Sequence, residues 1–332
     1  MAKRTTELRI MLAQLESIVR QYKILNNNVQ DRSAYEQNVE KRLRTCFEQL
    51  YPLIVQAVSS IRIPEKRGTK SKLKLEQKVI LLLIKQLIGK SNRNMSFMLV
   101  LFSTMTGIEV SYKTIERIFS DPLVKIAIYN LHILSLKKKG VKIADAVGDG
   151  TGHMVLIGEH YATTAQKLKD KAKNSASHNK TILYFFAVMD IKTRLYVGYG
   201  SSLRCEQDAQ KAALKMTKEC GVELEYYRID RLFSAEAYCN QCTSLFNNVK
   251  YITIPKKNIA HFGLGVWSKM LVSFLENPMS YLKTYYQRNQ AESGFAEDKK
   301  RTGWHIYVRK EDRIEVAQSI VALWHNLSWM MM

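Results

Sequence analysis

The segment YYQRNQAESGFAEDK, Tyr285–Lys299, carries the most informative pattern in the chain. Arg288 stands three positions after Tyr285, Glu292 stands four after Arg288, and Lys299 stands seven after Glu292. Because a helix turns by about 100° per residue, these four side chains fall within an arc of roughly 60°. The spacing predicts one helix face that presents a phenol, a guanidinium, a carboxylate and an ammonium together.

Two interpretations of this face are open. A carboxylate is the ligand that a hard divalent cation prefers, and Arg and Lys bind the phosphates that such a cation serves. The alternative is an exposed surface helix in which Arg288 and Glu292 form an ion pair at i,i+4, which has only a small effect on stability. The remaining sequence decides between them.

Size and charge narrow the class of protein. The chain has 332 residues, 46% of them hydrophobic, which suffices for one large or two medium domains. Its formal net charge of +21 indicates a polyanionic partner, either nucleic acid or an anionic membrane surface. The start lacks the apolar stretch of a signal peptide, and the longest apolar runs, Val79–Ile84 and Met98–Phe102, are too short to span a bilayer. We therefore expect a cytoplasmic protein that binds nucleic acid and no membrane.

Residues 1–140 have the periodicity of helices. Roughly two-thirds of the net charge lies in this region, which favours nucleic-acid binding. The expected elements are two helices within 1–60 (the second from about Ser33), a basic linker Pro64–Ser71, and helices Leu73–Ile88 and about Asn92–Met105, the last ending near Gly107.

A helix-turn-helix is predicted near residues 94–120. Ser111 is an N-cap candidate for its second helix, in which Ile115, Ile118 and Phe119 form the buried stripe. The start of that helix is where a recognition helix meets base edges and phosphates, and the residues there are Tyr112, Lys113, Thr114 and Arg117. The alternative is a helical hairpin without a DNA-reading role.

Residues 141–332 alternate between extended and helical patterns, which predicts a parallel-type sheet with helices on its faces. The expected strands are Val141–Val147, Thr181–Ile191, Arg194–Ser201, Leu224–Ile229 and Tyr251–Ile254. The expected helices are Glu206–Glu219, Ser234–Phe246, more than one helix between about Val266 and Arg301, and Arg313–Met331. This order is also that of the ribonuclease H-like fold.

Two aspartates follow predicted strands. Asp149 lies in Gly-Asp-Gly-Thr-Gly after the first strand, and Asp230 directly follows the fourth. In the ribonuclease H-like fold these two strands are neighbours, so both aspartates would share one sheet edge, where ligands of open α/β sheets collect. Asp145 is weighed as a core residue or an alternative ligand, Asp190 as a turn residue, and His153 as a DNA or metal contact that neither the chemistry nor the motif requires.

The positions Tyr285, Arg288, Glu292 and Lys299, together with the segments 148–152 and 229–234, resemble the motifs of DDE insertion-sequence transposases of bacteria and archaea. The resemblance covers about 141–310. It implies an α/β, ribonuclease H-like catalytic domain over 141–332, with a mixed sheet flanked by helices, preceded by an all-α DNA-binding region over 1–140. The interval between Asp230 and Glu292 leaves no room for the large β-rich insertion that some members carry.

The resemblance also implies a mechanism. Asp149, Asp230 and Glu292 would hold two Mg²⁺ (or Mn²⁺) ions that serve strand cleavage and strand transfer. The substrates would be the terminal inverted repeats of the element and a target DNA, with a homodimer acting on two ends in the nucleoid. Arg288 and Lys299 would hold phosphates, with Tyr285 as aromatic support.

Two rival functions remain: another ribonuclease H-like nuclease of the resolvase type, and a non-catalytic DNA-binding protein derived from a transposase. Two smaller features each have a functional and a non-functional interpretation. Lys167, Lys169, Lys171 and Lys173 are either phosphate contacts or part of a solvated loop. Cys239 and Cys242 are expected to be reduced, partly buried thiols rather than a zinc site.

Overall fold

A computed structural model gives the fold of the chain. It describes residues 2–25, 32–62, 72–92, 95–155, 182–256, 259, 262–308 and 310–331. The predicted linker Pro64–Ser71 and the four lysines between 167 and 173 lie outside these residues.

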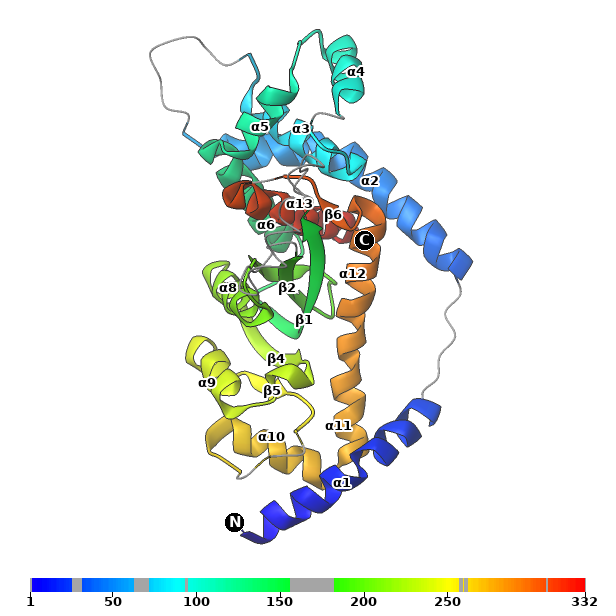
Figure 1. The fold of residues 1–332 in the computed structure, drawn as a ribbon, viewed down its shortest axis with the longest axis vertical. Coiled ribbons are helices and arrows are strands. Elements are labelled where there is room, and N and C mark those ends of the chain that lie inside the picture. The colour runs from blue at the N-terminus through cyan, green and yellow to red at the C-terminus, as the bar shows by residue number, and fades with distance from the viewer. Residues whose placement is uncertain are drawn as a thin grey trace, which may run out of the picture.

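The described residues before 140 form helices without strands. They are α1 (Ala2–Leu25), α2 (Arg32–Ser59), α3 (Leu75–Ile88), α4 (Ser96–Thr106), α5 (Tyr112–Phe119) and α6 (Pro122–Lys138). Gly107 ends α4 at a φ of 68°, a left-handed conformation that favours glycine, so the predicted helix end is confirmed. In Figure 1, α2, α3 and α6 lie together beside α13, whereas α1 lies at the other end of the molecule along α11.

The predicted start and buried stripe of α5 are confirmed. The Ser111 side chain accepts a hydrogen bond from the Thr114 amide, and Ile115, Ile118 and Phe119 are buried. These apolar residues pack α5 against α3, α6 and α13. α4 is different, because it leaves Phe97, Val100 and Leu101 exposed, and it projects from the body of the molecule in Figure 1.

Within the described residues, the centre of the fold is a six-stranded mixed sheet. A mixed sheet is what the family resemblance implied, whereas the element order predicted a parallel-type sheet and did not include the last strand. Its strands are β1 (Ile143–Val155), β2 (Ile182–Asp190), β3 (Tyr196–Ser202), β4 (Glu223–Ile229), β5 (Lys250–Ile252) and β6 (His305–Ile306). The order is β3-β2-β1-β4-β5, with β6 on the end of β1. β1 runs antiparallel to β2 and parallel to β4 and β6.

The first strand is longer than its apolar run, so the prediction that it ends at Val147 is wrong. Pairing with β4 stops at Gly148, but pairing with β2 continues to Met154, where β6 joins. Backbone pairing, rather than apolar side chains, keeps the Gly-rich segment extended. Asp149 therefore lies within β1, one residue beyond the end of its parallel pairing, and does not follow the strand.

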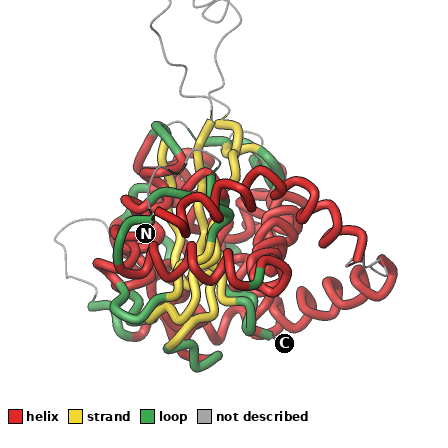
Figure 2. Tube along the Cα trace, turned by 90° about the horizontal axis from the view of Figure 1, so that it is seen from below, coloured by secondary structure: helices red, strands yellow, loops and turns green. Residues whose placement is uncertain are grey.

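Helices cover both faces of the sheet (Figure 2). One face carries α8 (Glu206–Glu219), whose bounds agree with the prediction, with α9 (Glu236–Leu245) beside it. The glycines of β3 allow this close packing, since a Cβ at Gly198 would lie 2.5 Å from the Ala213 carbonyl oxygen. The other face carries α12 (Asn289–Thr302) on β1 and α13 (Glu311–Met330) on β3.

The helices predicted from about Val266 to Arg301 are present. They are α10 (Gly265–Glu276), α11 (Pro278–Tyr285) and α12, with the 3₁₀ turn η2 (Tyr286–Arg288) between the last two. A 3₁₀ turn has three residues per turn rather than 3.6, so the single face expected for Tyr285–Lys299 is broken. The Tyr286 ring in this turn stacks on the Tyr22 ring of α1, with centroids 5.0 Å apart.

α13 joins the sheet to the N-terminal helices. The Asn326 side chain binds both backbone groups of Tyr196 on β3, accepting from its N at 2.8 Å and donating to its O at 2.9 Å. From the same helix, the Trp324 indole donates to the Leu83 carbonyl of α3 at 3.0 Å. Within the described residues, no helix combines the length and apolar character needed to cross a membrane.

Candidate active site

The three predicted carboxylates meet at one guanidinium. Arg288 donates from Nη1 to Asp149 Oδ1 and from Nη2 to Glu292 Oε1, both at 2.8 Å. Its Nη2 also lies 4.0 Å from Asp230 Oδ1. The carboxylates come from the middle of β1, the end of β4 and the first turn of α12. Segments distant in sequence therefore converge at the sheet edge where β4 ends.

Local structure fixes the two aspartates. Asp230 caps η1 (Arg231–Phe233), because its Oδ1 accepts from the Arg231 amide at 2.6 Å. Asp149 is positioned by the close contact of β1 with β4: at the preceding residue, Gly148, a Cβ would lie 2.7 Å from the Tyr227 ring. The glycine before Asp149 is thus needed for packing.

Burial differs among the three carboxylates. The side chain of Asp149 is 12% exposed, against 45% for Asp230 and 52% for Glu292. Burial raises the pKa of Asp149 to about 7, opposed by Arg288 and assisted by the charges of Glu292 and Asp230. A cation at this position stabilises the ionised form of Asp149, which is the role that Arg288 has here.

The donors suit a hard divalent cation, but their present arrangement does not form a ready site. Carboxylate oxygens are the ligands that Mg²⁺ and Mn²⁺ prefer. In the described part of the chain, no group of three or more His, Cys, Asp or Glu side chains is arranged to hold a metal ion. The Arg288 guanidinium lies between the carboxylates, so it must rotate away before a cation can contact all three.

The other two residues of the Tyr285–Lys299 pattern have different surroundings. Tyr285 is buried beneath Arg288, with its ring centroid 5.9 Å from Arg288 Cζ, and burial raises its pKa to about 12. Lys299 donates from Nζ to Thr151 Oγ1 at 2.6 Å, two residues beyond Asp149 on β1. Tyr285 therefore supports Arg288 from the core, and Lys299 faces the same strand as Asp149.

Three alternative ligands do not join the carboxylate group. Asp145 pairs with the buried Arg228. Asp190 accepts from the Thr193 amide at 2.9 Å and its hydroxyl at 2.7 Å, as expected for a turn residue. His153 is buried against the Phe185 ring, and burial lowers its pKa to about 4, so it is neutral. Cys239 and Cys242 are free thiols that are fully buried rather than partly buried as expected.

Glu206 is a further carboxylate at this edge that the sequence patterns did not single out. It is the first residue of α8, and its side chain lies against Gly150, the residue after Asp149. Its pKa is raised, mainly by burial and then by the charge of Asp230. The order of the strands could have identified Glu206. β3 runs parallel to β1, so the helix that follows β3 begins at the same sheet edge as Asp149 and Asp230.

The predicted DNA-reading residues lie elsewhere. On α5, Lys113 and Arg117 are exposed, while Tyr112 and Thr114 are half-buried. In Figure 1, α5 lies on the other side of α13 from the sheet. These residues therefore form a surface separate from the carboxylate group.

Comparison with known proteins gives one close relative. The chain is 39% identical over 290 residues to the probable transposase for insertion sequence element ISA1214 of Archaeoglobus fulgidus. The alignment covers 87% of this chain and 84% of that protein. No protein-family model matches the chain, and no solved structure matches it.

Proposed function

Because the chain belongs to the family of insertion-sequence transposases, we propose that it is a DDE transposase, which cleaves DNA at the terminal inverted repeats of its element and joins the ends to target DNA. The observation that carries this proposal is the convergence of Asp149, Asp230 and Glu292 on Arg288. Its partner is DNA, which agrees with the net charge of +21.

The sheet topology supports a ribonuclease H-like catalytic region. β1 and β4 are parallel neighbours, and β2 and β3 extend the sheet by antiparallel pairing. The central strands therefore supply two aspartates at one edge, and α12 supplies the glutamate from the adjacent face. This is the order of elements that the sequence resemblance implies.

The three carboxylates differ in burial, and this difference suggests a different role for each in the proposed reaction. Asp149, Asp230 and Glu292 would hold two divalent cations, which would supply Lewis-acid activation for the attack at phosphorus. Asp149, the most buried of the three and fixed within β1, provides the rigid ligand. Asp230 and Glu292 are half-exposed, so their side chains are able to adjust. Arg288 then exchanges carboxylate partners for the oxygens of a DNA phosphate.

Arg288→Ala should reduce cleavage more than Lys299→Ala does. Arg288 contacts Asp149 and Glu292, so a phosphate that it holds lies at the scissile bond, where a misplacement of about 1 Å costs on the order of 10²-fold in rate. Lys299 contacts Thr151 and acts on a neighbouring phosphate. Single-turnover cleavage at saturating protein measures the difference.

Arg288→Lys is the matched variant, because it keeps the charge but lacks the two-pronged geometry. We expect it to restore little activity. A rate close to wild type for Arg288→Lys, or a larger defect in Lys299→Ala than in Arg288→Ala, contradicts this assignment of roles.

Recognition of the terminal repeats is proposed for α5. Replacing Lys113 and Arg117 together by Ala should weaken binding to the element's end and reduce its salt dependence, because exposed phosphate or base contacts are lost. Binding titrations at several salt concentrations measure both effects. Lys139→Ala with Lys142→Ala removes equal charge outside α5 and serves as the control; an equal loss in both double variants contradicts the assignment.

The decisive test of function uses purified protein, Mg²⁺, a duplex carrying the element's terminal repeat, and a target plasmid. Cleavage followed by joining to the plasmid is expected, with assembly of a homodimer on two ends. Cleavage without joining supports a resolvase-type nuclease instead, and binding without cleavage supports a non-catalytic DNA-binding protein.

A further inference from the structure

The first helix, α1, brings an aromatic ring close to the candidate active site. Leu8, Leu12 and Leu15 are at most 3% exposed, and α1 packs against α10 and α11. Tyr22 stands seven residues after Leu15, about two helical turns, so its ring lies on the same face of α1 as these leucines. This face directs Tyr22 toward the segment that connects α11 to α12.

Tyr22 is the outer member of a series of aromatic contacts that ends at Arg288. Its ring stacks on the Tyr286 ring of η2, with centroids 5.0 Å apart and ring planes inclined by 13°. The Tyr286 ring meets the Tyr285 ring edge-on, with centroids 5.2 Å apart. The Tyr285 ring centroid lies 5.9 Å from Arg288 Cζ. Packed rings therefore connect α1 to the guanidinium at the centre of the carboxylate group.

The turn η2 needs such support from outside. A 3₁₀ turn has poorer hydrogen-bond geometry than an α-helix, and η2 consists of three residues between two α-helices. None of these three residues is fully buried, so the hydrophobic core does not fix them. The stack of Tyr22 on Tyr286 supplies a contact that does.

Aromatic packing is also the contact of Arg288 that remains during the proposed reaction. Its Nη1 and Nη2 atoms bond to carboxylates, and both bonds are released when a DNA phosphate takes their place. In the part of the chain that the structure describes, its Nε is buried without a hydrogen-bond partner. The rings beneath the guanidinium then remain to hold it.

We propose that Tyr22 is a positioning residue for Arg288. By stacking on Tyr286 it holds η2, and through η2 it holds the guanidinium where the scissile phosphate binds. This inference rests on the proposed transposase function and deepens it, because it makes the N-terminal helix part of the catalytic unit. A stacked aromatic pair corresponds to roughly a 2- to 13-fold change in an equilibrium constant.

The test compares Tyr22→Leu in two backgrounds of the full-length protein, wild type and Arg288→Ala. The first readout is single-turnover cleavage of a terminal-repeat duplex in Mg²⁺. In the wild-type background the rate should fall by roughly 10-fold, less than in Arg288→Ala, because the guanidinium is displaced rather than removed. In the Arg288→Ala background Tyr22→Leu should have no further effect, since substitutions that act through the same group are not additive.

The second readout is the salt dependence of binding to the same duplex in EDTA, which requires no cleavage. One phosphate contact contributes about 0.9 to the slope of log K against log salt concentration. Tyr22 is uncharged, so its loss lowers this slope only if a cationic side chain leaves its phosphate. Displacement of Arg288 should lower the slope by up to about 0.9 in the wild-type background and by nothing in Arg288→Ala.

Three further variants serve as controls. Tyr22→Phe keeps the ring and should retain most of the cleavage rate and the slope. Tyr286→Leu breaks the same stack from the side of η2 and should reproduce both effects. Tyr51→Leu removes an exposed aromatic ring on α2 and should change neither readout. Thermal denaturation checks that each variant is folded.

The outcomes separate this proposal from the proposed function. Equal effects of Tyr22→Leu in both backgrounds, or none in either, overturn the positioning role, and normal wild-type cleavage then leaves the transposase standing. An equal fall of the slope in both assigns direct phosphate contacts to α1, where Arg20 and Lys23 are exposed. If the slope falls only when Arg288 is present but wild-type protein never cleaves in Mg²⁺, the positioning role stands and the proposed enzyme activity is wrong. Wild-type protein that neither binds nor cleaves the duplex contradicts both.

Discussion

Asp230→Asn is expected to lower the rate of strand cleavage by on the order of 10³-fold or more, which corresponds to at least about 4 kcal/mol of lost transition-state stabilisation. Asp230 directly follows β4, and its carboxylate lies within 4.0 Å of the Arg288 guanidinium that also binds Asp149 and Glu292. An amide is a weaker ligand than a carboxylate for a hard cation. The loss of one proposed ligand would therefore weaken both the charge stabilisation and the positioning on which the proposed reaction depends.

DNA binding is expected to change little in Asp230→Asn, since the basic surface is intact. Asp149→Asn and Glu292→Gln should have effects of similar size, measured by single-turnover cleavage of a terminal-repeat duplex in Mg²⁺. Glu219→Gln, at the exposed end of α8, is the matched control and should cleave at the wild-type rate. Near-normal cleavage by any of the three site variants removes that residue from the site.

The parts of this site that sequence predicted are those that local pattern controls. Asp230 is identified because the predicted strand Leu224–Ile229 ends immediately before it, and the start of α8 is identified because strand periodicity gives way to helix periodicity. Ser111 is identified because hydroxyl side chains cap helices. Each signal lies within a few residues of the feature that it predicts, so no knowledge of the tertiary structure is needed.

The parts that sequence missed depend on contacts between distant segments. The length of β1 follows from its pairing with β2 and β6, which an apolar pattern does not encode. The break at η2 accompanies the stacking of Tyr286 on Tyr22 of α1 and the contact of Arg288 with Asp149. Glu206 reaches the carboxylate group only through the order of the strands. Tertiary contacts of this kind override helical periodicity.

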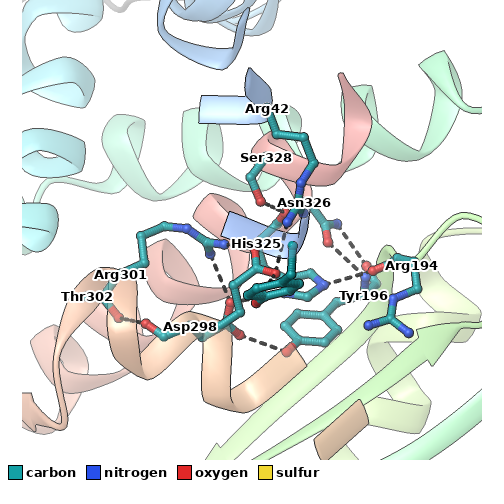
Figure 3. A network of polar contacts seen from close by, with 11 residues as sticks. Arg42, Arg194, Tyr196, Asp298, Arg301, Thr302, His325, Asn326 and Ser328 are labelled. Carbon is teal, nitrogen blue, oxygen red and sulfur yellow. Dashed lines mark hydrogen bonds and ion pairs between the residues drawn. The ribbon is translucent and has the colours of Figure 1, made fainter. Parts of the chain in front are cut away.

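Asp298 illustrates how a charged residue of α12 serves the site without joining it. It lies six residues beyond Glu292 and is buried, with polar partners on both carboxylate oxygens (Figure 3). Its carboxylate accepts from the Tyr196 hydroxyl at 2.7 Å, Arg301 Nη1 at 2.9 Å and His325 Nδ1 at 3.0 Å. The other ring nitrogen of His325 contacts the Arg194 carbonyl oxygen at 2.8 Å. The network thus joins α12 to β3 and α13.

A second carboxylate extends this network to the N-terminal helices. Glu297 pairs with Arg301 on its own helix and with Arg42 of α2 at 3.1 Å, and it accepts from the Tyr35 hydroxyl at 3.2 Å. The helix that carries Glu292 and Lys299 is therefore joined to β3, α13 and α2 by buried polar and charged side chains. Removing one member of this network leaves the charges of its partners uncompensated, and an uncompensated buried charge destabilises the folded state.

Asp298→Asn should destabilise the protein by about 3–5 kcal/mol, the usual cost of removing one partner from a buried ion pair. The amide keeps the shape of the side chain but leaves Arg301 and His325 without their anion. Burial by itself raises the pKa of Asp298, but the adjacent His325, Arg301 and Tyr196 outweigh it, so the pKa lies below the usual value for an aspartate. A depressed folded-state pKa means that this stabilisation is present above about pH 4 and is lost as the pH falls through the folded value.

Denaturant unfolding of wild type and Asp298→Asn at a series of pH values measures this difference. The difference in free energy of unfolding should be constant from neutral pH down to about pH 4 and should shrink below it, because protonation of wild-type Asp298 then removes the same charge. Asp312→Asn, at the exposed start of α13, is the matched control and should change the free energy of unfolding by less than about 1 kcal/mol. If Asp298→Asn unfolds at the wild-type denaturant concentration at pH 7, the network does not hold α12. A loosely held α12 would misplace Glu292 and Lys299 together, so the cleavage rate of the folded variant should also fall. A substitution remote from the DNA would then lower both the free energy of unfolding and the cleavage rate, because both depend on the position of this helix.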